Sequence, residues 1–313
     1  MKKFFRILLR TIIVLFILIN IIVMFHAYKF THFYNAGEVT VKPDSLKTGW
    51  EKTREAFLGI NFAKKNNGPK PDTAYQTVYL TTKDNLKLEG WYRPVDSAKG
   101  TVILFHGHGG NKTDVNHETA AFQKMGYNTF QLDFRAHGNS EGNTTTIGTN
   151  ESEDVKLAYD FIIAKGEKNI VLWGISMGAA TVAKAVNDYE LKPSAVILEM
   201  PFGSIYKAVR GRIRTMHLPE EPLSTLLTFW GGTEHGFWAF SNKPTEYVKK
   251  IECPVLLQWG KNDPRVTRQE IDDIYLNLHV QKTLVVYENT GHESICKKEN
   301  EKWVSSVKAF LRR

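Results

Sequence analysis

Apolar residues follow two different patterns along the chain. Residues 11–27 (TIIVLFILINIIVMFHA) form a nearly unbroken apolar run, whereas from residue 75 onward short apolar runs alternate with polar segments. Eight short runs rich in β-branched and aromatic residues predict strands, at 75–81, 86–92, 101–105, 127–132, 169–173, 195–199, 255–259 and 283–287. From residue 101 the segments between them favour helices, at 113–125, 151–165, 177–189, 268–279 and 299–311. This alternation predicts an α/β fold, with an eight-stranded, mainly parallel sheet flanked by helices.

One interval interrupts the alternation. About 50 residues separate the predicted strand that ends at Glu199 from the one that begins at Val255. The segment is much more apolar than a solvated loop, because it contains Leu223, Leu226, Leu227, Phe229, Trp230, Phe237, Trp238 and Phe240. An insertion of this size is typical of a functional element over a sheet edge. We expect residues 203–252 to form a lid insertion within a main domain at 75–313.

The N-terminal apolar run predicts a membrane-spanning helix within residues 1–30. Extending the run back to Ile7 gives 21 residues if Arg10 reaches toward the lipid headgroups. A cleaved signal peptide is the alternative, but its apolar region is normally about 7–15 residues and is followed by a small-x-small site. Phe25-His26-Ala27 lacks that pattern. A buried core helix fits less well because the run has no polar face at helical period.

Charge around this run predicts its orientation. Lys2, Lys3, Arg6 and Arg10 precede it, whereas only Lys29 and Lys42 follow closely. By the positive-inside rule the N-terminus is cytoplasmic, so the main domain of a single-pass cell-membrane protein faces outward. Residues 31–74 are expected to form a membrane-proximal stalk that packs partly on the domain, with a helix-like stretch at 45–60 and a breaker-rich one at 66–72.

Composition excludes several classes of protein. The 313 residues suit one main core with a short appendage. The formal charge is +8, but four positive charges precede residue 11, and no basic module suggests nucleic-acid binding. Cys253 and Cys296 stand alone, so free thiols or a single disulfide remain open. His106 and His108 lack the carboxylates or cysteines of a metal site, and no cofactor is implied.

A pentapeptide, GISMG at 174–178, is the first candidate for chemistry. It follows the predicted strand at 169–173 and opens the predicted helix at 177–189, which is the strand–turn–helix setting of a nucleophile elbow. Flanking glycines permit the tight turn that exposes the hydroxyl of Ser176 above the sheet edge. The alternative without a catalytic role is that Ser176 merely begins a helix.

A serine hydroxyl needs a base, and the base needs an orienting group. Asp263 follows the predicted strand at 255–259, and His292 follows the one at 283–287. Since the carboxyl ends of parallel strands meet at one edge, Ser176, Asp263 and His292 are expected to converge there. Glu199, at the end of another strand, is the alternative acid. His137 and Asp133 are expected to shape the loop after the fourth strand.

The chain resembles the α/β-hydrolase family, in particular bacterial hydrolases similar to monoacylglycerol lipases and serine aminopeptidases. The resemblance covers about residues 75–312 and rests on HGHGG at 106–110, DFRAHGNSEG at 133–142, GISMG at 174–178, GKNDPRV at 260–266 and NTGHES at 289–294. It implies Ser176 as nucleophile, His292 as general base and then acid, and Asp263 as orienting carboxylate. It also implies an oxyanion hole from the backbone N–H groups of His108 and Met177.

This reading predicts a serine hydrolase that forms an acyl-enzyme and cleaves carboxylic esters, with lipase-like or carboxylesterase activity on small-molecule or lipid substrates. An amidase or aminopeptidase is the alternative, since the same triad cleaves amides. Its amine-binding acids in the insertion would be Glu220, Glu221, Glu234, Glu246 or Glu252. A catalytically silent surface protein is a third possibility. Arg210, Arg212 and Arg214 are expected on a solvated face, with contact to anionic headgroups as the alternative.

Overall fold

A computed structural model describes residues 1–35, 37–71 and 74–312 of the chain. An eight-stranded sheet forms its centre, made of β3 (Gln76–Thr81), β4 (Lys87–Arg93), β5 (Thr101–Phe105), β6 (Asn128–Leu132), β7 (Ile170–Ile175), β8 (Ala195–Glu199), β9 (Val255–Gly260) and β10 (Lys282–Tyr287). Every one of these strands overlaps a strand that the sequence predicts. The strand order is β10-β9-β8-β7-β5-β6-β4-β3. All neighbours pair in parallel except β3 with β4 and β4 with β6, which pair antiparallel, so the mainly parallel sheet is confirmed.

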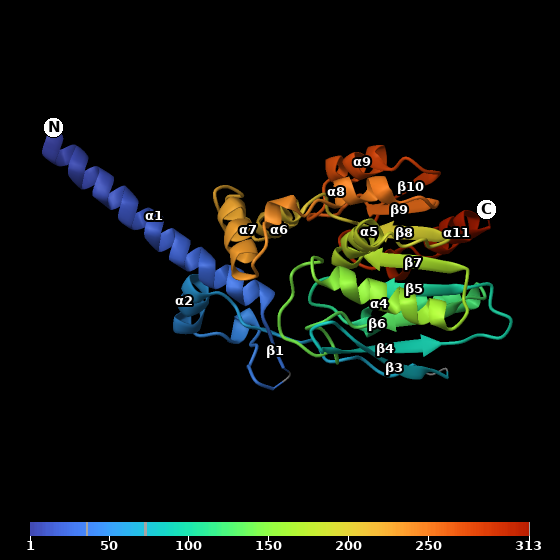
Figure 1. The fold of residues 1–313 in the computed structure, drawn as a ribbon. Coiled ribbons are helices and arrows are strands. Elements are labelled where there is room, and N and C mark those ends of the chain that lie inside the picture. The colour runs from blue at the N-terminus through green and yellow to red at the C-terminus, as the bar shows by residue number, and fades with distance from the viewer. Residues whose placement is uncertain (36, 72–73, 313) are drawn as a thin grey trace.

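Helices cover both faces of this sheet (Figure 1). One face is covered by α4 (Glu151–Ala164), α5 (Met177–Tyr189), α8 (Pro244–Tyr247) and α9 (Arg268–Asn277). Each of these four helices contacts the next one in this order. On the other lie α3 (Asn116–Lys124), α10 (Ile295–Lys298) and α11 (Asn300–Leu311). The central strands β5 and β8 are buried along their whole length, as expected for strands covered on both faces. Phe122 of α3 and Trp303 of α11 meet edge to face beneath the sheet.

The insertion forms helices beyond the carboxyl edge of the sheet. It comprises α6 (Ile205–Thr215) and α7 (Leu223–Glu234), followed by a short 3-10 turn at Ala239–Ser241, α8 and another turn at Val248–Lys250. In Figure 1, α6 and α7 lie between the sheet and the N-terminal helix. Cys253, which directly follows the insertion, and Cys296 are both free thiols. The alternative of a disulfide between them is therefore wrong.

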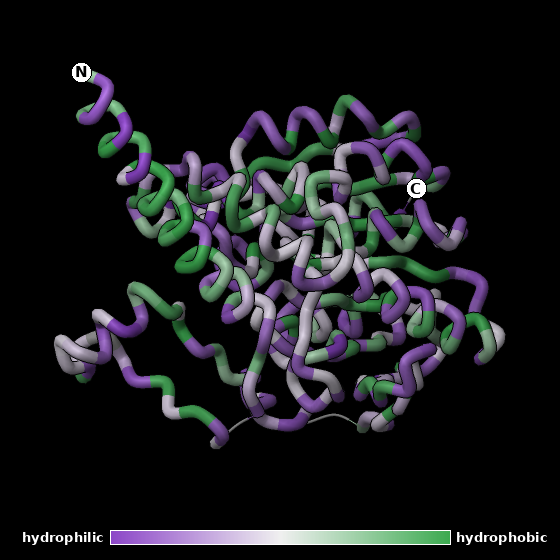
Figure 2. The backbone as a smooth tube through the Cα atoms, turned by 60° about the vertical axis from the view of Figure 1, so that its left-hand side comes forward, coloured by the Kyte–Doolittle hydropathy of each residue, from purple (hydrophilic) through white to green (hydrophobic). Residues whose placement is uncertain are grey.

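The N-terminal apolar run is a single 30-residue helix, α1 (Lys2–Thr31), that projects from the body (Figures 1 and 2). It is long and apolar enough to cross a membrane, and only 6% of its most apolar window is buried within the protein. Its second half packs against α7, where the Trp230 indole donates a 3.0 Å hydrogen bond to the Asn20 side chain. Asn20, in the middle of the apolar run, therefore has a partner on the insertion.

The segment expected to be a stalk is joined closely to the main domain. It contains α2 (Gly49–Leu58), a 3-10 turn at Asp44–Leu46, and two short paired strands, β1 (Phe33–Tyr34) and β2 (Phe62–Ala63). The Phe33 amide donates to the Asn143 carbonyl at 2.7 Å, and the Lys64 ammonium donates to the Ser140 carbonyl at 2.9 Å. Positions 36 and 72–73 of the expected stalk, and position 313 of the expected main domain, lie outside the described residues.

Candidate active site

Ser176 occupies the sharp turn between β7 and α5. Its backbone has φ 54° and ψ −116°, a combination that costs a non-glycine residue energy and that is typical of a nucleophile elbow. The Ser176 amide donates a 2.8 Å hydrogen bond to the Glu199 carbonyl at the end of β8. The neighbouring strand thus holds the turn at the carboxyl edge of the sheet, as the pentapeptide predicts.

Gly178 explains why the turn needs small residues. A Cβ atom at this position would lie 2.3 Å from the carbonyl oxygen of Phe105 and 2.7 Å from that of His106. Both are backbone atoms of a buried strand and the loop after it, so they have little freedom to move aside. Close packing of α5 on β5 therefore requires glycine here.

Asp263 and His292 reach the same point from the loops after β9 and β10. A 2.7 Å hydrogen bond joins His292 Nδ1 to Asp263 Oδ2. On the other side of the ring, His292 Nε2 lies 2.9 Å from Ser176 Oγ. The second oxygen of Asp263 accepts from the amides of Arg265 at 2.7 Å and Val266 at 2.9 Å. The Asp263 side chain is fully buried and that of His292 is 11% exposed. The three residues singled out by sequence therefore form one hydrogen-bonded chain.

Glu199, the alternative acid, belongs to a different environment. Its carboxylate accepts from the indoles of Trp173 at 3.0 Å and Trp303 at 2.5 Å. Burial, and next the neighbouring Glu118, raise the pKa of Glu199 to about 8, so the group stays largely protonated near neutrality. The structure assigns the contact with His292 to Asp263 instead.

The loop after β5 forms the wall beside Ser176. The Gly109 amide donates to His137 Nε2 at 3.1 Å, while Asp133 accepts from the Lys112 amide at 2.6 Å. His137 and Asp133 thus support this loop. His108 lies within it, and Met177 is the first residue of α5, where an amide has no acceptor in its own helix. His108, Met177 and Ser176 all line one cavity.

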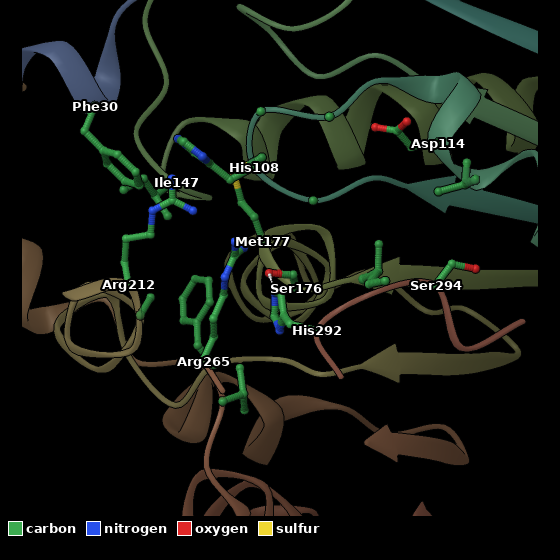
Figure 3. Close-up of a pocket in the computed structure, with 18 of the residues that line it drawn as sticks. Phe30, His108, Asp114, Ile147, Ser176, Met177, Arg212, Arg265, His292 and Ser294 are labelled. Carbon is green, nitrogen blue, oxygen red and sulfur yellow. Dashed lines mark hydrogen bonds between the residues drawn. The ribbon is translucent and has the colours of Figure 1, made fainter. Parts of the chain in front are cut away.

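That cavity has a volume of about 440 Å³ and is drawn in Figure 3. Its walls come from distant parts of the chain and are largely apolar, with contributions from Phe30, Phe33, Phe62, Ile147, Phe202 and Val209. Arg212 of α6 and Arg265 of the loop after β9 extend into it on the side of Phe30, whereas Asp114 and Ser294 lie on the opposite side (Figure 3). The cavity is large enough for a small organic ligand.

The sequence did not single out Phe30, Phe33, Phe62 or Arg265 as site residues. For Arg212 the sequence predicts only a place on a charged face. Arg265 stands two positions after Asp263 in the GKNDPRV motif, which was an available signal. For the aromatic residues no local signal exists, because their position depends on how the N-terminal segment folds back.

The fold and this site define an α/β-hydrolase, a class in which a parallel sheet presents an activated serine at its carboxyl edge. The model of the serine aminopeptidase S33 family (Hydrolase_4) matches residues 96–230. The Escherichia coli (strain K12) protein YfhR is 30% identical over 251 residues, which is 75% of this chain and 80% of YfhR. The chain belongs to the α/β-hydrolase family of serine hydrolases.

Other relatives carry names that describe an activity. The lysophosphatidylserine lipase ABHD12 of Xenopus tropicalis is 27% identical over 191 residues, and the match covers 56% of this chain but only 46% of that protein. Among solved structures, the Pyrococcus furiosus esterase Pf2001 is similar with a TM-score of 0.67 and 25% identity, over 80% of this chain and 97% of the esterase. An esterase from Exiguobacterium antarcticum shares the fold, with a TM-score of 0.59 and 17% identity over 76% of this chain and 100% of that one.

Proposed function

We propose that the protein hydrolyses carboxylic esters of acyl or lipid-like substrates through Ser176, His292 and Asp263. The observation that carries the proposal is the chain of hydrogen bonds from Ser176 Oγ through His292 to the buried Asp263, at 2.9 Å and 2.7 Å, opening on the cavity. In this reading His292 accepts the serine proton as Ser176 attacks the ester carbonyl. Asp263 fixes the tautomer and orientation of the imidazole.

The remaining steps follow from the same geometry. The amides of His108 and Met177 donate to the oxyanion of the tetrahedral intermediate, which is the largest electrostatic contribution in such reactions. His292 then gives its proton to the leaving alcohol, and an acyl-enzyme forms on Ser176. Water activated by His292 releases the acid and restores the serine.

The walls of the cavity favour an ester over the amine-bearing substrate of an aminopeptidase. Of the five glutamates considered for amine binding, Glu220, Glu246 and Glu252 pair with arginine or lysine, and Glu221 with Tyr206. None of the five lines the cavity in the described part of the chain. The names of the esterase and lipase relatives point the same way.

We further propose that α1 is a single-pass membrane anchor with a cytoplasmic N-terminus, that residues 31–74 connect it to a catalytic domain at 75–313 outside the cell membrane, and that the insertion at 203–252 acts as the lid. The length and apolar surface of α1 support the anchor. The contact between α1 and α7 would then hold the insertion near the bilayer surface. An amphiphilic substrate could enter the cavity from that side.

Labelling with a fluorophosphonate tests the mechanism. Full-length protein in neutral detergent should be labelled and should hydrolyse p-nitrophenyl butyrate. Ser176→Ala should abolish labelling and lower kcat/KM on the order of 10⁴-fold. Ser305→Ala is the control, because it removes a hydroxyl from the exposed face of α11 and should leave labelling intact.

Retention of ester hydrolysis by Ser176→Ala would contradict the proposed nucleophile. A folded wild-type protein that neither labels nor turns over the ester would favour the silent surface protein. Faster turnover of aminoacyl anilides than of acyl esters would favour the aminopeptidase.

A further inference from the structure

Three arginines on α6 have different surroundings. Arg210 and Arg214 are four residues apart, so they share a helix face, and both pair with Glu220, at 2.6 Å and 2.9 Å. Arg212 lies between them in sequence and therefore points to a different side. It extends into the cavity beside Ser176 (Figure 3). The expectation of one solvated basic face is thus wrong for Arg212.

Arg265 approaches the same place from the loop that carries Asp263. Its own amide is tied to Asp263 Oδ1 at 2.7 Å, so the backbone of this loop is fixed by the buried carboxylate. Helix α6 packs directly on it, because a Cβ atom at Gly211 would lie 2.2 Å from the Arg265 carbonyl oxygen. Glycine at this position lets α6 come close enough to bring Arg212 beside Arg265.

The two guanidinium groups lack a counter-charge. Within residues 1–35, 37–71 and 74–312, neither side chain takes part in a salt bridge or hydrogen bond, although Arg212 lies 6.0 Å from the centre of the Phe30 ring. Burial, and next the positive charge of Arg265, lower the pKa of Arg212. Two like charges in a partly buried, apolar cavity are unfavourable unless an anion joins them.

The carboxyl groups in the cavity wall do not supply that anion. Asp114 pairs with Lys65 and accepts from the Asn111 amide. Glu118 accepts from Ser294, and burial raises its pKa to about 7. Asp114 and Ser294 lie on the far side of Ser176 from the arginines (Figure 3). Asp263 is already bonded to His292 and to two amides.

His108 places the arginine pair close to the reaction centre. The pKa of His108 is lowered to about 3, mainly by burial and next by the neighbouring His137. The positive charges of Arg212 and Arg265 lower it further. Both charges are therefore near the residue whose amide would bind the oxyanion. Arg212, Arg265 and Ser176 line the same cavity, so an anion held by the pair would share that cavity with an ester carbonyl at Ser176.

We propose that Arg212 and Arg265 form an anion subsite that binds a phosphate or carboxylate group on the ester substrate. The proposal rests on the serine hydrolase mechanism above and narrows its substrate class to acyl esters with a negative charge near the ester. Planar guanidinium groups suit such a group because each offers two parallel N–H donors. Other apolar parts of the wall, including Phe33, Phe62 and Val115, accept the acyl chain.

Two matched substrates isolate the effect of the negative charge on turnover. Butyrylglycerol and butyrylglycerol phosphate carry the same ester and differ in the phosphate, and both are soluble, so partition into micelles does not contribute. We expect wild-type protein in neutral detergent to prefer the phosphate ester in kcat/KM. Arg212→Gln and Arg265→Gln should each lower that preference about tenfold or more, as expected for loss of a charge-assisted hydrogen bond. Arg212→Lys should keep part of it.

Arg210→Gln is the matched control, since it removes a guanidinium from the same helix that is already neutralised by Glu220. It should leave the preference unchanged. Dodecanoyl versions of both esters in neutral micelles distinguish a lipid headgroup from a small soluble anion. A preference confined to the dodecanoyl pair, and lost in the two arginine variants, identifies a lipid headgroup. A preference for both pairs, with competitive inhibition by glycerol phosphate, identifies the phosphate itself.

A preference that persists in both glutamine variants would overturn the subsite, provided that these variants still react with fluorophosphonate and hydrolyse butyrylglycerol. Equal turnover of the neutral and the phosphate ester by the wild type, in both the butyryl and the dodecanoyl pair, would overturn it too. Absence of labelling and turnover in the wild-type protein would instead reject the serine hydrolase mechanism.

Discussion

The two walls of the cavity are built in different ways. On the sheet side, Ser176, Asp263 and His292 follow three strands of one continuous sheet, and buried backbone contacts fix each of them. On the other side, the end of α1, β1, β2 and α6 come together from the N-terminal segment and the insertion. The first wall holds the residues to which we assign the chemistry. The second is assembled from segments outside the sheet, so we expect it to choose the substrate.

Packing tolerance should separate the nucleophile elbow most strongly from the open face of α7, the insertion helix behind the second wall. Gly178→Ala places a methyl group against two backbone carbonyls of the core and should destabilise the protein by about 3 kcal/mol, at the upper end for overpacking. Gly231 of α7 is the matched position, because a Cβ there meets no atom within 4 Å. Gly231→Ala should be neutral or stabilising by up to about 1 kcal/mol, since alanine favours helix.

Chemical denaturation of full-length protein in one neutral detergent measures both effects. Equal loss of stability in the two variants would mean that α7 is packed as tightly as the nucleophile elbow. The contrast between the rigid sheet edge and the open face of α7 would then be wrong.

Ionisation of a buried carboxyl group on the sheet side should change the free energy of unfolding. Burial raises the pKa of Glu199 to about 8 from its ordinary value near 4.5. Between these values the unfolded chain has released the proton while the folded protein retains it, so this group's contribution to stability is full below about pH 4.5 and falls as the pH rises. Glu199→Gln keeps an acceptor for the indoles but cannot ionise. The variant should therefore gain about 3 kcal/mol relative to wild type between pH 5 and pH 8.

Denaturation midpoints at both pH values give this difference. Titrating groups remote from Glu199 cancel because they are common to both proteins, whereas the neighbouring Glu118 interacts with Glu199 and contributes to the difference. Glu301→Gln, on the exposed start of α11, is the control and should show no comparable trend. A constant difference between Glu199→Gln and wild type across this range would show that the carboxyl group is not held protonated.

The same contrast explains what could be predicted from the sequence. Strands β5 and β8 and helix α5 begin and end where the pattern predicts, because strands covered on both faces read as apolar runs bounded by turns. The convergence of Ser176, Asp263 and His292 followed from one topological rule about the edge of parallel sheets. Sequence distance did not matter for these residues, since the sheet brings their loops together.

The second wall follows no such rule. Strands β1 and β2 have two residues each, too few to produce a periodic pattern. Phe62 therefore looked like part of a spacer, although it lines the cavity. Arg212 differs from Arg210 and Arg214 only by its helical phase, which has no meaning until α6 and its neighbours are known. Side chains that meet through tertiary packing of separate segments leave little local signal.

Shortening a side chain in the second wall should have the smallest effect and should alter selectivity. Phe62 is half-buried in β2 and meets the rings of Phe30 and Phe33 edge to face beside the acyl cavity. Phe62→Ala should lower kcat/KM about fivefold to tenfold for p-nitrophenyl octanoate, as expected for about 1 kcal/mol of lost apolar contact. The acetate ester should be affected less, because a short acyl chain does not reach this wall. Phe57→Ala removes an exposed ring from α2 and serves as control. Equal loss on both esters would mean that Phe62 supports the triad side instead, and the division of the cavity into a chemical and a selective wall would not hold.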